Sequence, residues 1–285
     1  MRAHPRSRSI GLFLSSLVLV AAATSTRAEL VGSAWAEQHA SRVRLVAGGA
    51  KAARGPSLAG LQIVLDEGWK TYWRMPGDSG VPPAFDWAGS SNVAAITVLY
   101  PVPQRMPEAG GFAVGYKQSV LLPIEVTPQD PAKPVALKLA LEFGVCREIC
   151  IPATASLDLA IPAGSKRAPP PELLAALERV PRPQASRRKT DPELRRVAID
   201  ATAGAPRLSV EAAFGGPAEA TDVFIEAPAG LYVALPRRVA PGGADGVLRF
   251  ETDLGRDLAQ DLKGKTLTIT LVSAVGASET QWKVP

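Results

Sequence analysis

The chain has 285 residues, of which 46% are hydrophobic and 21% charged, and its formal net charge is +5. The first 28 residues contain four arginines and no acidic residue, so the rest of the chain carries a net charge of only +1. A nucleic-acid-binding protein carries its basic residues on the folded part, so this balance argues against that class. The remaining length, about 257 residues, suits one large or two ordinary domains.

The first 28 residues have the pattern of a signal peptide. Arg2, Arg6 and Arg8 precede an apolar run over 10–23, and small residues follow around Ala28, where a signal peptidase would cleave. The apolar run is too short to cross a bilayer comfortably, and no later run approaches the roughly 18 apolar residues of a membrane helix. We therefore expect an exported protein whose mature chain has no membrane span.

Apolar residues alternate with polar ones through the first half of the mature chain, which is typical of half-buried strands. The clearest strand covers 135–145, where every odd position is apolar, and odd positions are apolar again at Leu157, Leu159 and Ile161. Turn residues separate such segments at intervals of roughly ten residues, as in a β-sandwich. We predict one sandwich domain over 29–163.

The composition changes over 164–196, where prolines occur beside a basic run at Arg187-Arg188-Lys189. We interpret this stretch as a Pro/Arg-rich linker with two helical turns over 172–179. Its positive charge is either simply solvated or a docking strip for an acidic partner or an anionic membrane. A second sandwich without cysteines is predicted over 197–285, with strands near Leu208 and Val210, Val223 and Ile225, Tyr232 and Ala234, Leu248 and Phe250, and over 267–271.

Cys146 and Cys150 are the two cysteines of the chain, and three residues separate them. His39, the one histidine after the signal, has no catalytic motif around it, so Ser-His-Asp or Cys-His hydrolysis is poorly supported. Two cysteines and a distant histidine do not make the usual zinc site, and no histidine follows for haem attachment. A redox disulfide, a structural disulfide and a Cu(I) site with two thiolates remain open.

The spacing of the cysteines constrains these alternatives. Residues four apart in a strand lie about 13 Å from each other, whereas disulfide Cα atoms lie within about 7 Å. A bond therefore requires a turn at Arg147-Glu148-Ile149 between two antiparallel strands. Both cysteines share the parity of Lys138 and Glu142, which predicts an accessible pair on the outward face. So small a loop would stabilise the fold by only about 2 kcal/mol, which favours thiol–disulfide exchange over a structural role.

Two motifs resemble the periplasmic N-terminal region of the DsbD/ScsB-type thiol:disulfide interchange proteins. They are Val145-Cys146-Arg147-Glu148-Ile149-Cys150-Ile151-Pro152 and Gly68-Trp69-Lys70-Thr71-Tyr72-Trp73-Arg74-Met75-Pro76-Gly77-Asp78-Ser79-Gly80. The resemblance covers about 33–162 and is weaker beyond. It implies a periplasmic, all-β protein with two immunoglobulin-like β-sandwich domains, in pathways such as cytochrome c biogenesis.

The resemblance also implies a function. Cys146 and Cys150 would be the catalytic redox pair, with Cys150 forming the mixed disulfide and Cys146 resolving it. The partners would be periplasmic thioredoxin-like proteins. The chain departs from the family because no membrane electron-transfer domain or thioredoxin domain follows, so we expect a separate membrane electron-transfer protein to supply electrons. We expect no cofactor and no metal. The alternative is a non-enzymatic binding module for Cu(I) or a protein, with a structural disulfide.

Aromatic residues near the motifs are candidates for shielding the disulfide or contacting a partner. Parity separates Trp69 and Trp73 from Tyr72, so the three cannot all point inward in a regular strand. A cover is expected from 75–83 or from the Gly110-Gly111-Phe112 region. Glu148 should disfavour a thiolate and Arg147 should favour it. The full set of shielding or contact candidates is Trp69, Tyr72, Trp73, Phe112, Tyr116, Phe143 and Glu148.

Overall fold

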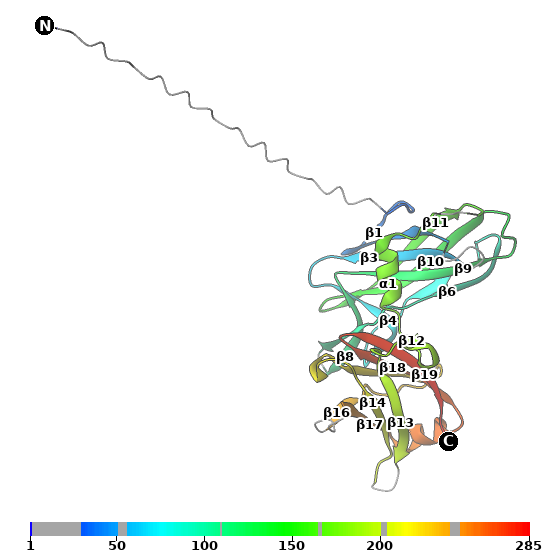
Figure 1. Ribbon diagram of the computed structural model, residues 1–285. Coiled ribbons are helices and arrows are strands. Elements are labelled where there is room, and N and C mark those ends of the chain that lie inside the picture. The colour runs from blue at the N-terminus through cyan, green and yellow to red at the C-terminus, as the bar shows by residue number, and fades with distance from the viewer. Residues whose placement is uncertain (2–29, 51–55, 109, 165–166, 201–203, 240–245) are drawn as a thin grey trace.

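The computed structural model describes Met1 and residues 30–50, 56–108, 110–164, 167–200, 204–239 and 246–285. The predicted signal peptide lies outside these residues, apart from Met1. Within the described ranges, no helix has the length and apolar character needed to cross a membrane. The architecture is all-β, as predicted, and consists of two immunoglobulin-like sandwiches arranged end to end (Figure 1).

Two sheets that enclose one core form the first sandwich. One sheet has the order β1 (Ala36–Gln38), β2 (Ser41–Ala50), β3 (Ser57–Leu65), β9 (Ser119–Pro128) and β6 (Val93–Val98). The other has the order β11 (Cys150–Ile161), β10 (Val135–Cys146), β4 (Lys70–Gly77), β8 (Gly111–Lys117) and β7 (Gln104–Glu108), and β5 (Ala84–Asp86) also pairs with β10.

The long hairpin β10–β11 confirms the alternation seen in the sequence. The two strands pair from Val135 with Ile161 to Cys146 with Cys150, without a register shift. The odd positions of both strands are buried over 135–145 and 153–161, while Lys138 is exposed. Apolar burial on one face thus fixes the register and carries the cysteines to the end of the hairpin.

The second sandwich has its own core. One sheet has the order β12 (Arg182–Pro183), β19 (Gly276–Lys283), β18 (Thr266–Ser273) and β15 (Asp222–Glu226). The other has the order β13 (Glu193–Asp200), β14 (Arg207–Ala213), β17 (Val247–Asp253) and β16 (Arg237–Val239), and short helix α2 (Arg256–Asp261) precedes β18. The predicted strand at Tyr232 and Ala234 was wrong: residues 231–236 have no strand. Pro228 and Pro236 flank it, and proline cannot donate to a ladder.

The segment 164–196, predicted as a linker, contributes to both sandwiches in its described part. The expected helix is present as α1 (Pro171–Glu178), which begins with proline at its first position and lies on β9. The following residues form β12, the 3₁₀ turn η1 (Gln184–Ser186) and the first residues of β13. Some of its basic residues form ion pairs: Arg182 contacts Glu178 and Asp191, and Arg187 contacts Glu193.

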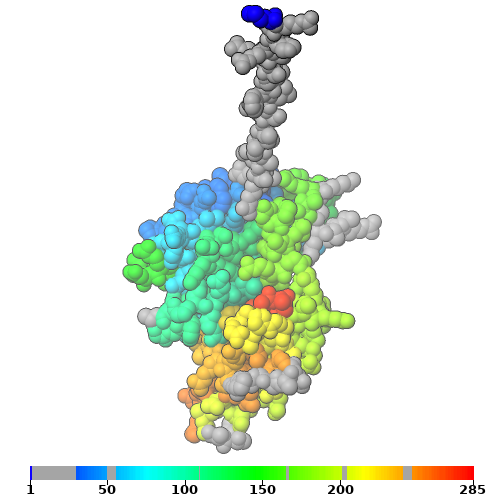
Figure 2. Space-filling view, turned by 60° about the vertical axis from the view of Figure 1, so that its left-hand side comes forward, coloured from blue at the N-terminus to red at the C-terminus, as the bar shows by residue number. Residues whose placement is uncertain are grey.

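The two sandwiches share an apolar and ionic boundary, and their surfaces meet directly (Figure 2). Phe224 of β15 is buried in the core of the first sandwich, and its ring centroid lies 5.5 Å from that of Trp73. Arg74 of β4 binds Glu226 and Glu279 of the second sandwich. The contact is therefore part of the folded core, and we expect the two sandwiches to unfold together.

Candidate functional site

A disulfide joins Cys146 at the end of β10 to Cys150 at the start of β11, with 4.2 Å between the Cα atoms. The N–H of Arg147 donates to the carbonyl oxygen of Ile149 at 3.1 Å, which closes the turn between the strands. The predicted cysteine-bearing turn between antiparallel strands is therefore confirmed. The disulfide lies at the end of the ladder between β10 and β11, where Cys146 pairs with Cys150.

The two cysteines differ in exposure. Cys150 is exposed, whereas Cys146 is 1% exposed. The prediction of an outward, accessible pair was therefore wrong for Cys146. Parity did place this residue outside the main core, but Tyr72, Met106 and Ala113 cover the outward face at this end of the sheet and form a small separate cluster with it.

Tyr72 is the side chain that contacts the accessible sulfur. Its hydroxyl lies 3.0 Å from Sγ of Cys150, and it must be the donor because a disulfide sulfur carries no hydrogen. Desolvation by burial, followed by the nearby charge of Glu108, raises the pKa of Tyr72 to about 12. The hydroxyl therefore keeps its proton throughout the neutral range and remains available to donate.

A short segment after β4 packs on the ring of Tyr72, and we call residues Asp78–Val81 the cover segment. Gly80 has a φ of +124°, and a Cβ atom there would lie 2.3 Å from Cε1 of Tyr72. Only glycine accepts both this backbone conformation and this close approach. The segment is paired with β8, because the N–H of Asp78 donates to the carbonyl oxygen of Phe112 at 2.9 Å.

Charged residues connect the cover segment to the cysteine turn. The ammonium group of Lys70 lies 2.5 Å from Glu108 and donates to the carbonyl oxygen of Arg147 at 3.3 Å. Ser79 of the cover segment also donates to Glu108. Desolvation alone would raise the pKa of Glu108, but the hydrogen bonds from Lys70 and Ser79 outweigh it and hold this pKa below its usual value.

The candidate Phe112 lies on the other face of the sheet. Pro107 pairs with Phe112 beside the Met106–Ala113 pair, and neighbouring pairs along a ladder point to opposite faces. The ring of Phe112 is 38% exposed and lies 5.4 Å from the guanidinium of Arg105. Of the two predicted covers, the structure therefore places the 75–83 segment, and not the ring of Phe112, against the tyrosine beside the disulfide.

The other candidates divide between the core and the site. Trp73, Tyr116 and Phe143 are buried in the first core, and the hydroxyl of Tyr116 donates to the carbonyl oxygen of Pro101 at 2.7 Å. Trp69 is partly buried, and the guanidinium of Arg147 lies 5.6 Å above its ring. Glu148 is exposed in the cysteine turn.

Sequence reasoning did not identify Lys70, Met106 or Glu108 as part of this region, and it included Asp78 only within the expected cover over 75–83. Lys70 and Asp78 lie within the aromatic motif, but their partners come from β7, β8 and the cysteine turn. Only the strand order shows that these elements meet.

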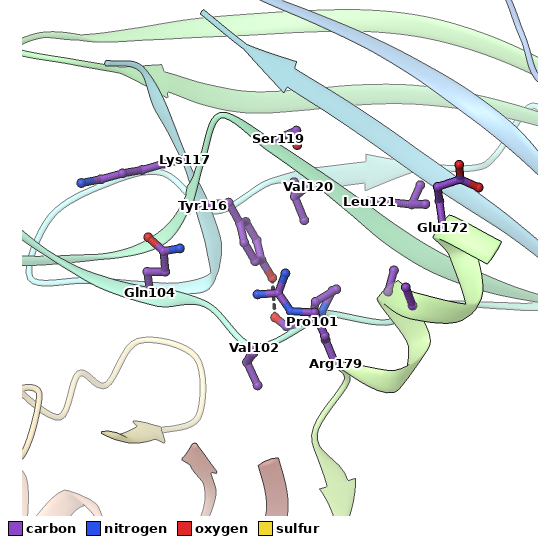
Figure 3. A pocket seen from close by; sticks show the side chains of 12 residues that line it. Pro101, Val102, Gln104, Tyr116, Lys117, Ser119, Val120, Leu121, Glu172 and Arg179 are labelled. Atoms are coloured by element: carbon purple, nitrogen blue, oxygen red, sulfur yellow. Dashed lines mark hydrogen bonds between the residues drawn. The ribbon is translucent and has the colours of Figure 1, made fainter. Parts of the chain in front are cut away.

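A separate cavity of about 300 Å³ lies between the first sandwich and α1 (Figure 3). Its lining includes Tyr116, Lys117, Glu172 and Arg179, and neither cysteine contributes to it. In the described part of the chain, no three His, Cys, Asp or Glu residues converge in a way that would hold a metal ion.

Comparisons with known proteins agree with this geometry. Residues 42–162 match the family model "Thiol:disulfide interchange protein DsbD, N-terminal". The crystal structure of the N-terminal periplasmic domain of ScsB from Proteus mirabilis is similar, with a TM-score of 0.67 and 22% sequence identity, over 90% of this chain and 99% of that one. No curated protein sequence gives a significant match. The resemblance predicted from the two motifs is confirmed over residues 42–162, which match the DsbD N-terminal family model, and the fold is similar to that of the ScsB N-terminal periplasmic domain.

Proposed function

We propose that this protein is a periplasmic thiol–disulfide exchange protein that relays electrons through Cys146 and Cys150. The observation that carries the proposal is the disulfide with one accessible and one buried sulfur, at the end of a hairpin within a DsbD-type domain. The partners would be periplasmic thioredoxin-like proteins, and a separate membrane electron-transfer protein would reduce the pair.

The difference in exposure supports a separate role for each sulfur. In the reduced protein, the thiolate of Cys150 attacks a sulfur of the partner's disulfide, and the partner's other sulfur leaves as a thiolate. The buried thiol of Cys146 then loses its proton and attacks Sγ of Cys150. This step expels the partner's second thiolate and reforms the Cys146–Cys150 bond. Two electrons pass to the partner, and the membrane donor returns two electrons for the next cycle.

Two neighbouring groups would support this chemistry. The hydroxyl of Tyr72 is placed to donate to the sulfur of Cys150 when that sulfur becomes a thiolate. The cover segment, packed on the ring of Tyr72 through Gly80, limits the directions from which a thiol can approach. A partner would have to fit beside this segment or displace it, which favours a specific protein surface over an unselective small oxidant.

Trapping of the mixed disulfide tests the proposal. A Cys146→Ala variant has no resolving sulfur, so we expect it to accumulate a covalent adduct with thioredoxin-like partners through Cys150. The adduct should be visible by non-reducing electrophoresis and should disappear on addition of dithiothreitol. The matched Cys150→Ala variant should form little adduct, because Cys146 is buried.

The proposal fails if neither variant forms an adduct, or if the wild-type disulfide resists both dithiothreitol and thioredoxin-like donors. Either result would support a structural disulfide in a binding module. An adduct that forms equally well through Cys146 would leave the exchange function in place but reverse the roles of the two cysteines.

A further inference from the structure

The second sandwich contacts the cover segment directly through one carboxylate. The hydroxyl of Tyr232, in the second sandwich, donates to Oδ1 of Asp78 at 2.6 Å. The other oxygen of the same carboxylate, Oδ2, accepts from the N–H of Phe112 at 2.8 Å. The carboxylate of Asp78 therefore links the start of the cover segment by hydrogen bonds to β8 of its own sheet and to the second sandwich.

From Asp78 the contacts continue to the disulfide. Two residues further along the chain, Gly80 packs on the ring of Tyr72, whose hydroxyl reaches Sγ of Cys150. Between them, Ser79 binds Glu108. Asp78, Ser79 and Gly80 thus connect the contact with Tyr232 to the ring that lies beside the accessible sulfur.

A second contact holds the strand pair on which the cover segment rests. Arg105 of β7 donates to the carboxylate of Asp222 at 2.9 Å through Nε and to the carbonyl oxygen of Pro236 at 2.9 Å. The same guanidinium lies over the ring of Phe112. The second sandwich therefore contacts β7 through Arg105 and the cover segment through Asp78.

We infer that the second sandwich positions the cover segment over the redox pair, with Tyr232 and Asp78 as the positioning residues. When their hydrogen bond is made, the segment stays on Tyr72 and limits access of thiols to Cys150. The inference deepens the proposed function, because it assigns to the cysteine-free sandwich the control of access to the same disulfide.

The test is the rate at which dithiothreitol reduces the disulfide in the full mature chain. Tyr232→Phe keeps the ring and removes only the hydroxyl. We expect reduction to become about two- to tenfold faster, as the loss of one hydrogen bond allows. The equilibrium constant with dithiothreitol should stay unchanged, because the hydrogen bond lies outside the reacting atoms in both redox states. Gly80→Ala, which forces the segment off Tyr72, should give the fastest reduction and serve as the open reference.

Two further variants separate positioning from a general loss of structure. Asp78→Asn should also accelerate reduction, and adding Tyr232→Phe to it should produce little more, because both remove the same hydrogen bond. Tyr100 is a buried residue near the same boundary, with its ring centroid 5.8 Å from the guanidinium of Arg74. Tyr100→Phe therefore removes a hydroxyl near the boundary without changing Asp78, and it should react like the wild type.

The inference is overturned if Tyr232→Phe reacts at the wild-type rate, or if Tyr100→Phe accelerates reduction equally. Since dithiothreitol needs no protein partner, this outcome is independent of the trapping experiment. Acceleration in Tyr232→Phe without any trapped adduct would retain the positioning role and reject the relay. A trapped adduct without acceleration in Tyr232→Phe would retain the relay and reject the positioning role.

Discussion

Replacing Arg74 with alanine should lower the free energy of unfolding by about 2–4 kcal/mol, because it leaves two carboxylates of the second sandwich without their cation. The guanidinium binds Glu226 through two nitrogens, with Nη2 at 2.7 Å from Oε1 and Nε at 2.9 Å from Oε2, and it also contacts Glu279. The side chains of Arg74, Glu226 and Glu279 are 26%, 18% and 30% exposed, so water replaces the lost contacts only in part.

The same variant also removes a cation–π contact, since the guanidinium of Arg74 lies 4.4 Å from the ring centroid of Trp73. Urea denaturation followed by tryptophan fluorescence would measure the change as a lower midpoint with an unchanged slope. Arg207→Ala is the matched control. Arg207 pairs with Asp253 on an exposed surface, and its second partner Glu251 keeps an ion pair with Arg249, so the free energy of unfolding should stay close to the wild type.

Two results would contradict the account of Arg74. One is a midpoint shift no larger than that of Arg207→Ala, which would show that the ion pairs contribute little. The other is a wild type that unfolds in two separate transitions, since Phe224 is buried in the core of the first sandwich and should couple the two.

The second large effect is expected for Tyr72→Phe in the reduced protein. The hydroxyl that lies 3.0 Å from Sγ of Cys150 would donate to the thiolate, and a hydrogen bond to a charged group stabilises by about 1.5–3 kcal/mol. Its loss should decrease the thiolate population at neutral pH by roughly ten- to a hundredfold. Because a less stable thiolate is also more nucleophilic, exchange should slow by only about three- to tenfold.

The thiolate of Cys150 can be followed by its ultraviolet absorbance as the pH is raised. The hydroxyl stays protonated because the pKa of Tyr72 is raised to about 12, so the wild type keeps this donor through the whole titration of a thiol. In Tyr72→Phe the absorbance should appear at higher pH, while Tyr100→Phe should superimpose on the wild type. Superimposed titration curves for Tyr72→Phe and the wild type would show that the hydroxyl of Tyr72 does not stabilise the thiolate of Cys150.

The sequence predicted well what depends on alternation along a strand. The odd positions of β10 and β11 determine which face is buried, and they led to the hairpin, its turn and the class of the fold. Parity also separated Trp73 from Tyr72: the structure places Trp73 in the main core and Tyr72 in the cluster with Cys146. These features need only the period of the strand and the chemistry of the side chains.

The odd or even position of a residue in a strand does not show which other element covers the outward face of the sheet. Cys146 was expected to be accessible because its even position points away from the main core, yet Tyr72, Met106 and Ala113 bury it. Asp78 binds partners 34 and 154 positions further along the chain, on β8 and in the second sandwich. Such contacts depend on the order of the strands in each sheet and on the packing of the two sandwiches. A local sequence pattern predicts neither.

The same long separations set an order of events during biogenesis. Arg74 meets its partners Glu226 and Glu279 across 152 and 205 positions of the chain, and contacts this distant form late in folding. The hairpin β10–β11, whose strands are neighbours in sequence, can close before β15 and β19 have docked. We therefore expect that, during folding, the hairpin can form before Tyr232 of the second sandwich reaches Asp78. Until that contact is made, the cover segment lacks one of its two anchors and Cys150 is more open to thiols than in the folded protein.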